Sequence, residues 1–97
     1  MFTEGCKIVT VSRDGAKLAS GRYPVWVTAV YQAVRRADGV LTWRRVDSVG
    51  HSTSGYKVTS PMIHRATAYA RLHGLEYVPH VRAGMMVEYT SRQFSSI

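Results

Sequence analysis

The strongest constraint on the fold is the pair Asp38-Gly39, which lies between two runs of residues that favour β-strands. The first run, Val25 to Val34, contains Val, Trp, Thr and Tyr, and the second extends from Val40 to Val46. Asp-Gly between two such runs is typical of a tight β-hairpin turn. The sequence therefore predicts a hairpin across this part of the chain.

A two-residue turn at this point would place Val34 opposite Trp43 and Arg36 opposite Leu41. The first run also admits a helix, because Pro24 suits a first helical turn. Five apolar residues would then share one helical face: Trp26, Ala29, Val30, Ala33 and Val34. The strand is the preferred interpretation because the turn signal is specific, and the helix is the alternative.

A second segment has clear helix boundaries. Ser60 suits the N-cap, Pro61 the first helical position and Gly74 the residue after the last turn, so a helix is expected over about residues 61–73. Its buried stripe is expected to contain Ile63, Ala66 and Ala70, with Met62 and Tyr69 as further candidates. Strand-like composition recurs in further segments, at 7–12, 56–58, 75–78 and 85–90, with a weaker candidate at 16–20.

These elements predict an α+β fold: an antiparallel sheet of about five strands with one amphipathic helix packed on one face. The other face or the hairpin tips would remain open to a partner. The length of 97 residues predicts a single domain over 1–97, with residues 94–97 as a flexible tail.

Composition narrows the class of protein. A single cysteine, Cys6, excludes an intramolecular disulfide and favours a reducing, cytoplasmic location. Residues 1–7 lack the apolar core of a secretory signal. The apolar run from Tyr23 to Val34 is shorter than the roughly 20 residues of a membrane-spanning helix, so no membrane association is expected.

The charge points to an acidic partner. Lys and Arg number 13 against 6 Asp and Glu, which gives a net charge of +7 and a pI near 10.1. Ten of the cations are arginine, whose planar fork binds phosphate and carboxylate in a bidentate manner. Nucleic acid or a ribonucleoprotein is therefore the favoured partner, and a merely solvated basic surface is the simpler alternative.

The candidate binding residues gather around the predicted hairpin. They are Arg35, Arg36, Arg44 and Arg45, with Lys57 and Arg13 as further cations and Trp43 as an aromatic ring that either stacks on a base or fills the core. Neighbouring residues of a strand point to opposite faces, so each arginine pair would be divided between the two sides of the sheet.

Catalytic and metal-binding signatures are weak. Cys6 and the histidines at 51, 64, 73 and 80 form no pair at a ligand spacing, and no glycine-rich phosphate loop or serine elbow occurs, so no metal or cofactor is expected. One enzymatic hypothesis is metal-independent ribonuclease chemistry at His51, with Arg44, Arg45 and Tyr56 around the phosphate.

The preferred interpretation is a small non-enzymatic protein that docks an arginine-rich hairpin and loop on nucleic acid, with little base specificity. The alternative is an inhibitor or accessory factor of the kind that phages and mobile elements encode, directed at an acidic groove of a host protein. Exposed strand edges would also permit a homodimer.

Overall fold

The computed structural model describes residues 2–12, 26–51 and 60–87. In chain order these form strands β1 (Lys7–Ser12), β2 (Val27–Arg35) and β3 (Leu41–His51), helix α1 (Ser60–Leu72) and strand β4 (Glu76–Tyr77). The strands expected at 16–20 and 56–58, the tail at 94–97, and the candidate residues Arg13 and Lys57 lie outside the described residues.

The described strands form one sheet in the order β3-β2-β1-β4. β2 is antiparallel to both β1 and β3, whereas β4 runs parallel to β1. The predicted α+β class, with one helix on a sheet, is confirmed. The described sheet has four strands and is mixed, because α1 carries the chain from β3 across to the far edge, and β4 then runs in the same direction as β1.

The segment that admitted both strand and helix is strand β2, and it forms the predicted hairpin with β3. The predicted register is wrong by one residue, since Trp43 pairs with Ala33 and Leu41 pairs with Arg35. The cause is a longer turn.

In this turn the Gly39 N–H donates to the Arg36 carbonyl at 2.9 Å, and the Arg36 N–H donates to the Val40 carbonyl at 2.9 Å. Gly39 has a φ of +85°, so the loop holds three residues, with the glycine in the left-handed conformation typical of such turns. The extra loop residue shifts the pairs nearest the turn, from Arg35–Leu41 to Tyr31–Arg45, by one position. Irregularities between Val30 and Tyr31 and between Thr28 and Ala29 change the register beyond them.

Helix α1 confirms the sequence prediction to within one residue at each end. Its end is a Schellman-type cap around Gly74, whose φ is +67°. The Leu75 N–H donates to the Ala70 carbonyl at 2.7 Å, and the Gly74 N–H donates to the Arg71 carbonyl at 3.4 Å. These bonds satisfy carbonyl groups that the last turn would otherwise leave unpaired.

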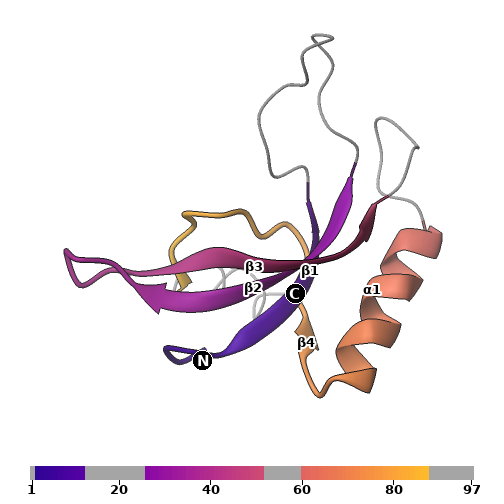
Figure 1. Ribbon diagram of the computed structural model, residues 1–97, viewed down its shortest axis with the longest axis horizontal. Coiled ribbons are helices and arrows are strands. Elements are labelled where there is room, and N and C mark those ends of the chain that lie inside the picture. The colour runs from indigo at the N-terminus through magenta and orange to yellow at the C-terminus, as the bar shows by residue number, and fades with distance from the viewer. Residues whose placement is uncertain (1, 13–25, 52–59, 88–97) are drawn as a thin grey trace, which may run out of the picture.

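Helix α1 covers one face of the sheet at β1 and β4 (Figure 1). Met62, Ala66 and Ala70 pack in one cluster with Val9, Val11 and Val30 of the sheet. The two alanines let the helix approach the strands closely. Of the other residues predicted for the buried stripe, Met62 is buried, whereas Ile63 and Tyr69 are only partly buried.

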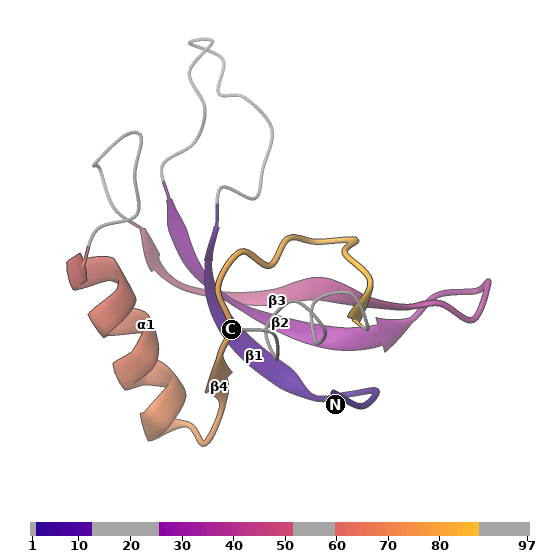
Figure 2. The same cartoon turned by 180° about the vertical axis from the view of Figure 1, so that it is seen from behind.

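The opposite face is covered by residues 78–87, which we call the strap. Figures 1 and 2 show this orange-to-yellow segment leaving β4 and crossing the sheet toward β3. Val78, Val81 and Val87 are almost completely buried, in one cluster with Ile8, Ala29, Tyr31, Ala33 and Trp43. The expectation of an open second face is therefore wrong where the strap lies.

Main-chain hydrogen bonds join the strap to β1 at its start and to β3 near its end. At its start the Val78 N–H donates to the Val9 carbonyl at 2.9 Å. Near its end the Trp43 N–H donates to the Met85 carbonyl at 3.0 Å, and the Gly84 N–H donates to the Trp43 carbonyl at 2.9 Å. The strand predicted at 85–90 is, in its described part, a single bridge between Met86 and Thr42.

Within the described residues no helix has the length and apolar character needed to cross a membrane.

Candidate functional site

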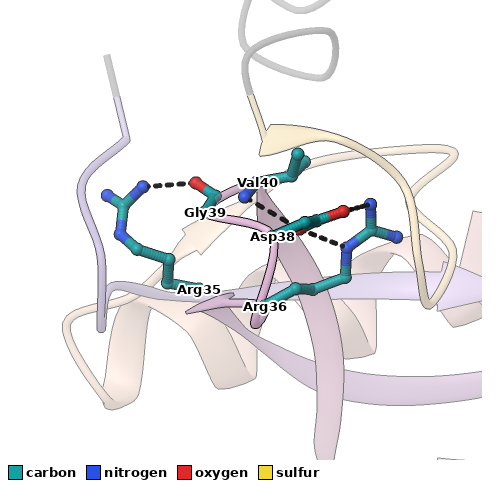
Figure 3. A network of polar contacts seen from close by, with 5 residues as sticks. All are labelled: Arg35, Arg36, Asp38, Gly39 and Val40. Carbon is teal, nitrogen blue, oxygen red and sulfur yellow. Dashed lines mark hydrogen bonds and ion pairs between the residues drawn. The ribbon is translucent and has the colours of Figure 1, made fainter.

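The tip of the β2–β3 hairpin carries two of the predicted arginines in a network of contacts (Figure 3). The Arg36 guanidinium donates two hydrogen bonds to the Asp38 carboxylate, from Nε to Oδ1 at 3.2 Å and from Nη2 to Oδ2 at 2.7 Å. The Val40 N–H donates to the same Oδ1 at 3.1 Å. The Arg36 guanidinium and the Val40 N–H both hold the pKa of Asp38 below its ordinary value.

Arg35 is held by different partners. Its Nη1 donates to the Gly39 carbonyl at 2.6 Å, and its Nε lies 3.5 Å from Glu4 Oε2. Both tip arginines therefore pair with a carboxylate and brace the turn. The pairs are solvent-exposed, where such contacts add little stability and exchange readily, so an external anion can compete for either guanidinium.

Arg44 and Arg45 lie further along β3 and are both exposed. Arg44 pairs with Gln32 and Arg45 with Tyr31 across the hairpin. Since successive strand residues point to opposite faces, the two side chains leave β3 on opposite sides, as pleating predicts.

Beside these two arginines the surface is hollowed. The strap approaches the outer edge of β3 here, where Gly84 bonds to Trp43, and an open hollow of about 570 Å³ lies between them. We call it the edge hollow; the described residues that line it are Val34, Thr42, Trp43, Arg44, Arg45, Ala83 and Gly84. None of these lining residues is acidic, in contrast to the hairpin tip.

Trp43 belongs to the core. Its side chain is 1% exposed, and its ring packs edge-on against Phe2 with centroids 5.3 Å apart. The small residue opposite it, Ala33, leaves room for the indole. Of the two interpretations of Trp43, the core residue is confirmed and the stacking ring is wrong. Its main chain joins the strap to β3 beside the edge hollow.

Of the residues behind the ribonuclease hypothesis, His51 ends β3 and its main chain pairs with Val27. Its side chain and Tyr56 lie outside the described part of the structure. Among the residues that are described, no three His, Cys, Asp or Glu side chains lie close enough together to hold a metal ion.

Sequence reasoning missed the second wall of the edge hollow. Ala83 and Gly84 reach it only because the strap crosses the sheet, and no local pattern links them to β3. Other exposed cations, Arg65 and Arg71, lie on α1, which packs on β1 and β4 at the other side of the sheet.

No family model, curated protein or solved structure matches the chain, so a functional argument has to start from the site itself.

Proposed function

We propose that this chain is a small non-enzymatic binding protein that docks the β3 side of its hairpin on nucleic acid. The observation that carries the proposal is the edge hollow, which Arg44 and Arg45 border without an acidic residue among its described lining. The carboxylates of Glu4 and Asp38 lie at the hairpin tip, beside Arg35 and Arg36, and would repel a phosphate there. Of the predicted cations, Arg44 and Arg45 border the surface whose described lining has no acidic residue.

The charge of the whole chain supports the same partner. A net charge of +7 attracts a polyanion from a distance, and arginine forks bind phosphate oxygens in pairs. Contacts of this kind position the protein on the backbone and carry no sequence information. Binding should therefore be strongly dependent on salt and weakly dependent on base sequence.

The test is a series of fluorescence anisotropy titrations with labelled single-stranded and duplex DNA and RNA, from about 50 to about 200 mM salt. The double variant Arg44→Gln/Arg45→Gln should bind more weakly. On duplex DNA, its log–log salt slope should fall in magnitude by about 1.8, because each phosphate contact contributes about 0.9.

The matched control is Arg65→Gln/Arg71→Gln, which removes the same charge from α1. This control should retain the salt slope of the wild-type protein. If the wild-type protein binds none of the four nucleic acids at low salt, the proposal is wrong. If both double variants lose the same slope, general charge rather than the edge of β3 is responsible.

One observation favours the protein-binding alternative. The hairpin tip has charges of both signs, with Glu4 and Asp38 beside Arg35 and Arg36, and mixed charges suit a protein surface better than a uniform polyanion. An inhibitor of this type would be captured with its partner equally well before and after nuclease treatment. A nucleic-acid-bridged partner would be lost.

The ribonuclease hypothesis makes a separate prediction. The wild-type protein would cleave RNA in the presence of a chelator, and His51→Ala would abolish the cleavage. Intact RNA in the first experiment would remove this hypothesis.

A further inference from the structure

The edge hollow has features that binding to a duplex backbone does not require. Its lining includes the apolar residues Val34 and Ala83, so it offers more than positive charge. Its volume of about 570 Å³ lies within the range of about 300–1,000 Å³ typical of small-molecule sites. A phosphate group alone would leave most of this space empty.

The arginines also approach the hollow in an unusual way. Arg44 and Arg45 leave β3 on opposite faces, yet both line the same hollow at the strand edge. Arginine side chains are long, so guanidinium groups that start on the two faces of an edge strand can both reach a group held at that edge.

The strap residues that line the edge hollow are small and leave free space beside them. Ala83 has only a methyl group, and a Cβ placed on Gly84 would meet no atom within 4 Å. Small residues at this point leave space for a flat ligand beside the main chain of β3. A guanidinium group binds phosphate oxygens in pairs, so the arginines can hold the phosphate of a nucleotide whose base lies against the apolar part of the lining.

We propose that the edge hollow accommodates one unstacked nucleotide of a single strand, with its base against Val34 and Ala83 and its phosphate at Arg44 and Arg45. This inference rests on the proposed function and specifies its ligand class. A paired base is held in the duplex stack and reaches the hollow only by flipping out, which is unfavourable. The protein therefore prefers single strands over duplexes of the same charge.

The experiment compares three labelled probes of about 12 nucleotides, a length within the range of single-strand sites. They are a thymidine strand, an abasic strand with the same number of phosphates, and a duplex that contains the thymidine strand. Because one base leaves water for an apolar wall, the wild-type protein should bind the thymidine strand several-fold more tightly than the abasic strand. The thymidine strand should also bind more tightly than the duplex.

Two variants locate the preference. Ala83→Leu fills the edge hollow from an exposed position and should abolish the preference, so that the thymidine and abasic strands bind with equal affinity. Val34→Thr keeps a similar shape but replaces apolar surface with a hydroxyl, and it should reduce the preference. Circular dichroism and thermal unfolding establish that both variants are folded.

The outcomes separate this inference from the proposed function. Equal binding of the thymidine and abasic strands, or an unchanged preference in folded Ala83→Leu, would overturn the inference and leave the proposed function intact. Binding of the duplex in preference to the thymidine strand would do the same. If no probe binds at low salt, the proposed function itself fails.

Discussion

The strap offers the sharpest test of the fold, because it explains how the second face of the sheet is covered. Val81 is fully buried in the cluster that contains Tyr31 and Trp43. Val81→Ala removes two carbon atoms from that cluster, at about 0.8 kcal/mol for each buried methylene-sized group. The cavity left behind raises the expected loss of unfolding free energy to about 2–3 kcal/mol.

The chain contains a matched control for this substitution. Val46, on β3, is 44% exposed, so Val46→Ala makes the same chemical change in contact with solvent. Surface substitutions of this kind usually change stability by less than about 0.5 kcal/mol. The comparison isolates burial under the strap from any intrinsic effect of replacing valine by alanine.

The assay is urea denaturation of the wild-type protein and both variants, followed by fluorescence. The dependence of free energy on urea should remain the same in all three, since the surface exposed on unfolding hardly changes. A domain of this size has a total stability of about 5–15 kcal/mol, so a loss of about 2–3 kcal/mol is measured easily. If Val81→Ala is no less stable than Val46→Ala, the strap does not cover the sheet as described.

Three further predictions concern the hairpin and its core. Gly39→Ala should destabilise the protein by about 1 kcal/mol through the φ of +85° alone, since a Cβ at this position meets nothing within 4 Å. Gly39→Asn should destabilise it less, because asparagine tolerates this conformation, and equal losses of unfolding free energy would contradict the role of φ. Tyr31→Phe removes the buried 3.1 Å hydrogen bond between the hydroxyl groups of Tyr31 and Ser12 and should cost about 1 kcal/mol in the same assay, and an unchanged stability would show that the bond contributes nothing. In an NMR titration the pKa of Asp38 should lie below its ordinary value and should rise in Arg36→Gln; a pKa that does not respond to this substitution would refute the assignment. Because the folded-state pKa is lowered, the contribution of Asp38 to stability is present above its unfolded pKa and is lost as the pH falls through its folded pKa.

Local signals explain what the sequence predicted well. Helix α1 was placed within one residue because Ser60, Pro61 and Gly74 act within one turn of their own positions. The hairpin was identified from Asp38-Gly39, but its register was not. Whether the loop holds two or three residues depends on the hydrogen bonds of one glycine, which the residue types alone do not determine.

The strap was beyond sequence reasoning for a different reason. Its buried valines, Val78, Val81 and Val87, follow neither the strand period nor the helix period, because the surface that they cover decides their spacing. Strand β4, in contrast, lies within the strand predicted at 75–78, although it pairs with β1 over two residues only.

At the candidate site, too, the local features could be predicted from the sequence and the nonlocal contacts could not. Arg44 and Arg45 were predicted from their place beside the turn, and they do line the edge hollow. The partner of Arg36 was visible in the sequence, since Asp38 follows it two residues later, whereas the contact between Arg35 and Glu4 requires the folded N-terminal segment. Nonlocal contacts thus account for most of what was missed.

The strap also has a consequence for the order of events in folding. Met85 binds Trp43 across a long stretch of intervening chain, and the surface under the strap exists only after β1, β2 and β3 have paired. Closing so large a loop is entropically unfavourable, so the strap should dock after the rate-limiting transition state. In stopped-flow experiments Val81→Ala should then mainly accelerate unfolding and leave the refolding rate nearly unchanged. The lifetime of the edge hollow, whose second wall is the strap, would be set by how rarely that segment detaches.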